Sequence, residues 1–345
     1  MHTLTNPSLK DSWLAVRKEN PRIRIRDAAR QLGVSEAAIL ASFSGGNDVI
    51  RLAGDFRELW KRMPGLGYIM SLTRNESCVH ERKGIFENVH AGSGHVGFVA
   101  GKDIDLRMFF RHWAFGFALR DNTAAGFKNS LQFFDQQGTA VIKIFLQEES
   151  DRDAFEKLTH DFTAADQSPL LETAPPAPSQ AYADELVNEA AFREDWSRLK
   201  DTHDFFPMLK KHNISRLHAL RIAGEFTRKI DAGSVKKLLY DASASGMEIM
   251  VFVGNPGNIQ IHTGPVKNIV EIPGWINVMD PEFNLHLRTG DIAECWSVRK
   301  PTADSAVHSV EVFDAAGSLI VQFFGKRKPG IPELPEWAAY VNSLR

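Results

Sequence analysis

Residues 74–94, RNESCVHERKGIFENVHAGSG, have a counterpart at 254–274, GNPGNIQIHTGPVKNIVEIPG. Four positions match without a gap at a spacing of 180 residues: Asn75 with Asn255, Gly84 with Gly264, Asn88 with Asn268, and Gly94 with Gly274. FDQQG at 134–138 likewise returns as FDAAG at 313–317, and residues 32–40 are similar to 212–220. Because the units of solenoid proteins are only about 20 to 50 residues long, a repeat of this length indicates a duplicated domain.

The length and composition fit a globular protein of two domains. At roughly 100 to 200 residues per domain, 345 residues leave room for an N-terminal repeat at 1–165, a linker at 166–183 and a C-terminal repeat at 184–345. The expected linker is rich in proline, alanine, serine and threonine, which is typical of connecting segments.

Charge and cysteine content exclude several classes of protein. A net charge of −2 and a pI near 6.6 give no bulk attraction to nucleic acid or anionic membranes. Two cysteines cannot build a disulfide framework or an iron–sulfur site by themselves. The chain starts without a signal-peptide pattern and has no long apolar run, so we expect a cytoplasmic protein without membrane insertion. Monomer and homodimer both remain open.

Each half is expected to begin with helices and continue with strands, which predicts an α+β fold with helices packed on an antiparallel sheet. The expected helices lie at 9–18, 25–32, 35–43, 55–62, 183–200, 207–211, 215–226, 234–243 and 335–344. The expected strands lie at 67–73, 78–82, 96–99, 106–112, 130–134, 140–146, 248–253, 259–263, 275–278, 285–287, 309–313 and 318–324. Ser35 is expected to act as a simple N-cap.

The segment DTHDFFPMLKKHNISR, residues 201–216, carries the first candidate binding group. Pro207 suits the first turn of a helix, and we expect Asp204 to cap that helix with His203 directly before it. A neutral imidazole is a good axial ligand for haem iron, and the two adjacent phenylalanine rings would suit a porphyrin face. A capping or surface histidine is the alternative interpretation of the same pattern.

Two further segments supply cations and other groups that could bind the anionic edge of a ligand. RKPT at 299–302 places adjacent cations at an expected turn, and QFFGKR at 322–327 places an amide, two rings and two cations at a strand end. Haem is an apolar disc with two carboxylates on one edge, so its pocket needs apolar walls and Arg or Lys donors. Solvated charges at strand ends are the alternative.

Four of the candidate groups have no like residue in the first copy, whereas one cation does recur, since Arg299 aligns with Arg120. The aligned pairs are His203 with Ile23, Arg216 with Glu36, Lys300 with Asp121, and Gln322 with Lys143. We therefore expect the second half to bind the ligand and the first half to serve as a scaffold.

Further segments add a family resemblance: RNE at 74–76, VHE at 79–81, DLR at 105–107, QFFD at 132–135, HDFF at 203–206, LKKHN at 209–213, EIMVFVGN at 248–255 and RKPT at 299–302. With these segments the chain resembles the HemS/ChuS/HmuS/PhuS family of cytoplasmic haem-utilisation proteins over essentially its whole length. The resemblance implies a duplicated α+β unit, two large antiparallel sheets flanked by helices, and haem in a cleft between the halves.

The resemblance also implies roles for individual residues toward haem b, iron protoporphyrin IX. His203 matches the axial ligand of the haem iron. Four other positions match residues that stabilise or line the bound haem, chiefly near its propionates: Arg216, Lys300, Gln322 and Arg327. Phe324 stands where several relatives carry tyrosine, so one hydroxyl hydrogen bond is expected to be missing.

Three positions of the first half match further family sites. Arg107 and Phe109 match residues on the distal side of the haem, where Arg107 is a candidate catalytic residue that orders water or peroxide. His80 matches a histidine proposed in some relatives as a second haem site, and its counterpart is Gln260.

The expected function is to accept imported haem and either transfer or degrade it for iron acquisition. A haem carrier and a haem oxygenase-like enzyme that releases iron both remain open, because relatives that share these segments include both. A haem-uptake transporter and a downstream haem oxygenase or acceptor are the expected protein partners.

A DNA-binding regulator is the remaining alternative, because residues 25–40 have the pattern of a helix-turn-helix. The start of its second helix, Glu36-Ala37-Ala38, is small, apolar and acidic, whereas a DNA reader needs side chains that contact bases. The same pattern recurs near Ser215, which favours structural packing. Nucleic acid is therefore not an expected partner.

Overall fold

The structure is a computed structural model that describes residues 8–94, 96–176, 182, 184, 187–303, 305–327 and 332–345. The chain forms two compact units. Unit 1 comprises Met1–Arg74, Glu81–Pro178 and Asn255–Gln260, and unit 2 comprises Asn75–His80, Ser179–Gly254 and Ile261–Arg345. Part of the expected linker, residues 177–181 and 183, lies outside the described residues.

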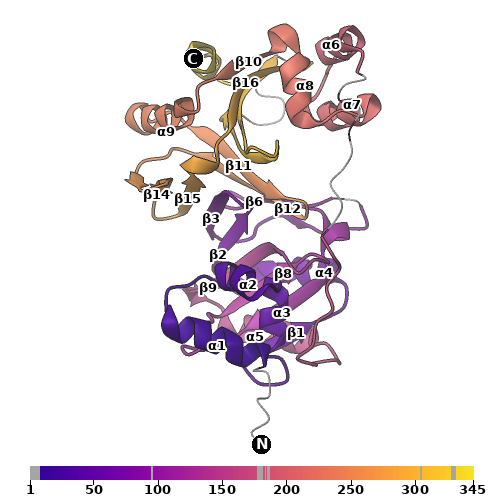
Figure 1. Cartoon of the computed structure of the whole chain (residues 1–345), viewed down its shortest axis with the longest axis vertical. Coiled ribbons are helices and arrows are strands. Elements are labelled where there is room, and N and C mark those ends of the chain that lie inside the picture. The colour runs from indigo at the N-terminus through magenta and orange to yellow at the C-terminus, as the bar shows by residue number, and fades with distance from the viewer. Residues whose placement is uncertain are drawn as a thin grey trace, which may run out of the picture. The chain divides into compact units, whose positions relative to one another are not determined.

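In unit 1, helices pack on both faces of an antiparallel sheet (Figure 1). Within unit 1 the sheet runs in the order β1 (Val49–Leu52), β7 (Phe115–Leu119), β8 (Ser130–Phe134), β9 (Ala140–Ser150), β2 (Gly67–Arg74) and β3 (Cys78–Gly84), and of β3 the residues from Glu81 onward belong to this unit. One face packs on α1 (Leu9–Glu19), α2 (Ile25–Leu32) and α3 (Glu36–Ala41). The other packs on α4 (Phe56–Lys61), η1 (Met63–Leu66) and α5 (Arg152–Asp161). Three short strands complete the unit: β4 (Val89–His90), β5 (Gly97–Ala100) and β6 (Asp105–Met108), followed by η2 (Phe110–His112).

Unit 2 repeats this plan. Its sheet runs in the order β10 (Thr227–Ile230), β16 (Glu294–Pro301), β17 (Ala306–Phe313), β18 (Leu319–Gly325), β11 (Ile249–Asn255) and β12 (Asn258–Gly264), except that Asn255–Gln260 belong to unit 1. One face packs on α6 (Glu189–Ser197), α7 (Phe205–His212) and α8 (Arg216–Ile222), and the other on α9 (Gly233–Ser245) and α10 (Pro335–Ser343). The remaining elements are η4 (Thr202–Asp204), η5 (Gly224–Phe226), β13 (Ile269–Ile272), β14 (Trp275–Met279), β15 (Phe283–Arg288) and η6 (Thr289–Asp291).

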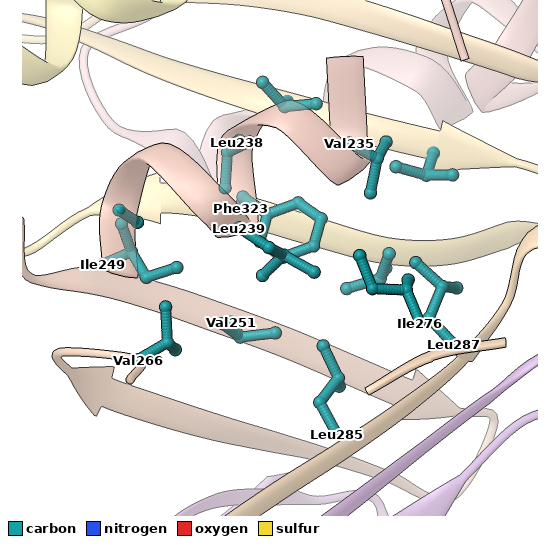
Figure 2. Close-up of a cluster of buried hydrophobic side chains, with 14 of the residues drawn as sticks. Val235, Leu238, Leu239, Ile249, Val251, Val266, Ile276, Leu285, Leu287 and Phe323 are labelled. Carbon is teal, nitrogen blue, oxygen red and sulfur yellow. The ribbon is translucent and has the colours of Figure 1, made fainter. Parts of the chain in front are cut away.

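The alternation of side chains along the strands of unit 2 positions the candidate site. Figure 2 shows α9 side chains, among them Leu239, packed with Val251 and Phe323 in the apolar cluster on one face of the sheet. Val310 and Val312 of β17 belong to this cluster. Because successive side chains of a strand point to opposite faces, Glu311 between them faces α6, α7 and α8.

The turns of the hairpins β2–β3 and β11–β12 belong to a different unit from most of the hairpin: Asn75–His80 belong to unit 2 and Asn255–Gln260 to unit 1. The sequence did not predict this assignment. The turn at Asn75 belongs to unit 2, where its Oδ1 accepts hydrogen bonds from the backbone N–H groups of Ser77 and Cys78 at 3.1 and 2.9 Å. Its Nδ2 donates to the carbonyl of Ile320 at 2.8 Å. One side chain therefore both shapes the turn and fastens it to β18.

Asn255 does the same within unit 1. Its Oδ1 accepts from the backbone N–H groups of Gly257 and Asn258, both at 3.0 Å. Its Nδ2 donates to the carbonyls of Val141 and Arg74 at 2.8 and 3.0 Å. The first repeated asparagine pair thus has one structural role in both copies.

The predicted α+β class is confirmed, and the helix predicted at 25–32 has the observed bounds of α2. Ser35 caps α3, since its Oγ accepts from the backbone N–H of Ala38 at 3.1 Å. Several elements were not predicted from the sequence, among them α5, β1, β4, β7, β10, β13 and β16. In the part of the chain that the structure describes, no helix has the length and apolar character needed to cross a bilayer.

Candidate functional site

His203 lies in the 3₁₀ turn η4, directly before α7. Asp201 caps this turn, and its Oδ1 accepts from the backbone N–H of His203 at 2.8 Å. Asp204 completes a capping box, because its carboxylate accepts from the backbone N–H of Asp201 at 3.0 Å. Asp204 is the N-cap residue of α7, as predicted, but its side chain makes no capping hydrogen bond to that helix. Its carboxylate instead turns back onto η4, where reciprocal capping satisfies two backbone donors.

The imidazole of His203 is oriented by the same carboxylate. Its Nδ1 lies 2.6 Å from Oδ1 of Asp201, and its side chain is 92% exposed. The backbone N–H of His203 holds the pKa of Asp201 below its ordinary value, with burial opposing and the imidazole adding to the effect. An ionised carboxylate is only an acceptor, so Nδ1 is the donor, and in a neutral imidazole Nε2 then has the lone pair that a metal needs.

Asp201 was not predicted as a site residue. The pattern of two aspartates three positions apart, on either side of His203, indicates a capping box and could have identified it. The orienting hydrogen bond itself depends on side-chain geometry that the pattern does not specify.

The two phenylalanines after η4 have different surroundings. Phe205 is 2% exposed and its ring lies 5.0 Å from that of Trp196 in the helical core. Phe206 is 62% exposed. The expectation that both rings present a face to the ligand is therefore wrong, because Phe205 is needed for the core and only Phe206 of the pair remains accessible.

Arg216 and Lys300 meet at one buried carboxylate, that of Glu311. Arg216 binds it in a fork, with Nε 2.7 Å and Nη2 2.9 Å from the two carboxylate oxygens. Nζ of Lys300 lies 2.7 Å from Oε1. Both cations also lie over the ring of Phe205, at 5.1 and 4.4 Å from its centroid. These contacts bring the two predicted cations together.

The prediction that residues 299–302 form a turn is wrong for Lys300, which is 4% exposed within β16. The strand continues to Pro301, paired with Ala306. Lysine can occupy this buried strand position because the carboxylate of Glu311 neutralises it.

Glu311 is ionised despite its burial. Burial alone would raise the pKa of this carboxyl, but the charges of Arg216 and Lys300, together with their hydrogen bonds, hold it well below its usual range. Burial lowers the pKa of Lys300, and Glu311 opposes this shift. Glu311 was not among the predicted site residues, although a single charge between two valines of a strand is a signal that could have identified it.

The remaining predicted residues of unit 2 lie on or just after β18. Gln322 pairs in register with Glu311. Phe324, two residues on and so on the same face, has its ring 4.8 Å from that of Phe252. Arg327 is half-buried just beyond the strand. Because alternate side chains of a strand share a face, the amide of Gln322 and the ring of Phe324 lie next to each other on one face of β18.

Arg107 and Phe109, the two predicted distal residues of unit 1, contact different groups. Arg107 in β6 binds the carboxylate of Asp105 and donates to the carbonyl of Leu106 at 2.9 Å. Phe109 is half-buried, and its backbone N–H donates to the carbonyl of Gly257 at 2.9 Å. These contacts fix the backbone beside the two predicted distal side chains, whose role stays a prediction.

His80 belongs to unit 2 and is fully buried, with its ring 4.9 Å from that of Phe283. A ligand at this imidazole would require the surrounding core to open. The second haem site at His80 stays a prediction to which the geometry adds no support.

The first copy carries a different buried pair at the corresponding place. Nζ of Lys143 lies 2.6 Å from Oε2 of Glu36, and both side chains are buried. Lys143 pairs in register with Gln132, just as Gln322 pairs with Glu311. The first copy therefore holds one balanced ion pair where the second holds two cations and one carboxylate.

The geometry does not favour DNA binding. Five of the six residues of α3, the expected reading helix, are buried, and Glu36 is one of them. A helix packed in this way cannot present side chains to the bases in a major groove.

The chemistry of the donors in unit 2 fits haem. Nε2 of His203 can ligate iron, the exposed ring of Phe206 can contact an apolar disc, and Arg216 and Arg327 can bind carboxylates. No group of three or more His, Cys, Asp or Glu suited to a bare metal ion occurs among the described residues.

Comparisons with known proteins cover nearly the whole chain. It is 36% identical over 341 residues to the hemin transport protein HmuS of Yersinia pestis, with 98% of each covered. The crystal structure of holo-PhuS, a heme-binding protein from Pseudomonas aeruginosa, matches with a TM-score of 0.94, 49% identity and 98% of each chain covered. That of ChuS, called an E. coli heme oxygenase, matches with a TM-score of 0.87 and 34% identity, covering 98% of this chain and 99% of the other.

A family model, described as the haemin-degrading HemS.ChuX domain, matches residues 33–162 and again residues 213–344. One match lies in each half of the chain. The chain therefore belongs to the family of the haemin-degrading HemS.ChuX domain and contains that domain twice.

Proposed function

We propose that this protein is a cytoplasmic haem-binding protein that accepts imported haem b as cargo and passes it to an acceptor for iron acquisition. The observation that carries the proposal is the exposed imidazole of His203, oriented by Asp201 so that Nε2 can ligate iron. Relatives described as hemin transport and heme-binding proteins support the same cargo. A haem-uptake transporter and a downstream oxygenase or other acceptor are the partners this role requires.

Each group in unit 2 has a distinct task in this proposal. Asp201 holds the imidazole in one tautomer and one orientation, which lowers the entropy lost on ligation. Phe206 supplies an apolar surface, since its ring is 62% exposed. Arg216 supplies charge for the carboxylate edge of the cargo. The bound haem supplies a Lewis-acidic iron as the target for Nε2.

The test is a haemin titration of the apoprotein followed by transfer to apomyoglobin. We expect a saturable Soret band near one haem per chain, followed by full transfer on mixing with excess apomyoglobin. A linear, non-saturating absorbance would contradict specific binding. A saturable complex that never yields its haem to apomyoglobin would contradict the carrier role.

Degradation is the second candidate, favoured by the relative that is called a heme oxygenase. In that case Arg107, whose guanidinium binds the carboxylate of Asp105, would order water or peroxide by hydrogen bonding. With an electron donor and catalase present, loss of the Soret band with one defined tetrapyrrole product would support an enzyme. Bleaching that catalase abolishes would indicate attack by free peroxide instead.

A further inference from the structure

Arg216 and Lys300, two cations assigned to the carboxylate edge of the haem, already hold a carboxylate of the protein itself. The side chain of Glu311 is 0% exposed and accepts from both cations at 2.7 to 2.9 Å. A fork between guanidinium and carboxylate is the geometry by which Arg also binds propionates. The carboxylate of Glu311 is therefore bound by Arg216 and Lys300 in the way that a haem propionate would be.

The first copy shows that this arrangement is not required by the fold. There the position of Glu311 is taken by Gln132, and a single pair of Lys143 and Glu36 fills the space with balanced charge. Both copies thus keep a buried ion pair between the sheet and the first helices. Only the second copy adds a cation in excess of its carboxylate.

We propose that Glu311 is a built-in competitor of the haem propionates for Arg216 and Lys300, and that this competition makes haem binding reversible. The inference rests on the proposed function and deepens it, since a carrier must release its cargo. Glu311 is a positioning residue in this role, because it acts on the cargo through the two cations.

Two physical effects of the carboxylate point the same way. In the ligand-free protein it neutralises buried charge that would otherwise destabilise the fold, because an uncompensated buried cation is costly. In the haem-bound protein it weakens the field of both cations at the propionates, since opposite charges a few ångströms apart largely cancel at a third charge. Both effects lower haem affinity relative to a site without Glu311.

The experiment compares Glu311→Gln with Glu36→Gln, which removes the corresponding buried carboxylate of the first copy. Haem transfer to excess apomyoglobin is followed for the holoproteins, and the unfolding midpoint is measured with and without haem. We expect Glu311→Gln to slow transfer by about tenfold or more, and to widen the haem-induced increase in midpoint, while Glu36→Gln leaves transfer unchanged. Transfer at the wild-type rate or faster from Glu311→Gln would overturn the proposal.

A second ligand separates charge competition from a general structural effect. Iron protoporphyrin IX dimethyl ester lacks the carboxylates, so Glu311→Gln should release it at the wild-type rate. Equal slowing of both ligands would overturn the competition. Should Glu311→Gln fail to fold, Glu311→Asp keeps the charge but withdraws it by one methylene, and slower release of haem but not of the ester is again expected. A wild-type protein without a saturable Soret band would instead contradict the proposed function itself.

Discussion

At the scale of single residues, the proposed ligation of iron by His203 depends on Asp201. An exposed histidine can adopt either tautomer and several rotamers, and each lost alternative costs free energy on ligation. The 2.6 Å contact between Nδ1 and Oδ1 of Asp201 restricts that freedom in the ligand-free protein. An imidazole that donates to a carboxylate is also a more basic ligand.

We therefore expect Asp201→Asn to weaken haem binding by roughly 10-fold to 100-fold, the usual cost of losing an outer-shell carboxylate. Haem titration measures the affinity, and the reduction potential of the bound iron should rise as the ligand becomes less basic. Asp204→Asn is the matched control, because Asp204 belongs to the same capping box but its carboxylate accepts from backbone N–H groups of Lys200 and Asp201. Equal losses in both variants would mean that the turn, and not the imidazole contact, determines affinity.

At the scale of elements, β16, β17 and α8 are joined through the charges of Lys300, Glu311 and Arg216. Removing one partner of a buried pair typically costs about 3 to 5 kcal/mol. In the folded protein the pKa of Glu311 is far below its ordinary value of 4.5. The ionised carboxylate therefore contributes its full stabilisation above about pH 4.5, and this contribution declines as the pH falls below about 4.5.

The difference in unfolding free energy between wild type and Glu311→Gln should therefore be largest near pH 7, at about 3 kcal/mol. It should shrink steadily below about pH 4.5, where the unfolded chain, but not the folded protein, takes up a proton at this carboxyl. Denaturant unfolding at a series of pH values gives both curves. A difference that stays constant from pH 7 to pH 3 would contradict an ionised, charge-stabilised Glu311.

The two hairpin asparagines give a second prediction at this scale. Asn75→Ala leaves two turn N–H groups and the carbonyl of Ile320 without their partner, so we expect a loss of about 1 to 3 kcal/mol. Hydrogen exchange should accelerate first around Ile320 in unit 2. For Asn255→Ala the same loss should accelerate exchange around Val141 in unit 1. Indistinguishable exchange patterns in the two variants would contradict the assignment of each turn to its unit.

How far these elements could be predicted depends on how local their causes are. The helix at 25–32 ends at Gly33, whose positive φ of 68° suits glycine, and so was predicted with its observed bounds. β16 was missed because its burial of Lys300 depends on a carboxylate eleven positions later. His203 was selected from its own surroundings and from the repeat, whereas Glu311 became visible only through its two partners in space.

At the scale of the whole molecule, the chain contains two copies of one plan, and the groups proposed to bind haem iron and propionates lie in the second copy. The first copy keeps the balanced pair of Glu36 and Lys143, and the second has the partners of Glu311 together with His203. The assignment of each hairpin turn to the other unit could not be predicted, because Asn75 binds Ile320, which lies 245 positions away in the sequence. The repeat itself was visible because turns and asparagine anchors need the same residues in both copies.

The central claim, that His203 of the second copy ligates the haem iron, is tested most directly by haemin titration of His203→Ala beside His160→Ala. His160 is the matched control in unit 1, since its side chain is 90% exposed and its Nδ1 also contacts an aspartate, Asp161, at 3.2 Å. We predict that His160→Ala keeps the wild-type Soret band and affinity, while His203→Ala shifts the band and binds haem roughly tenfold or more weakly. A His203→Ala protein with the wild-type spectrum and affinity would contradict the claim.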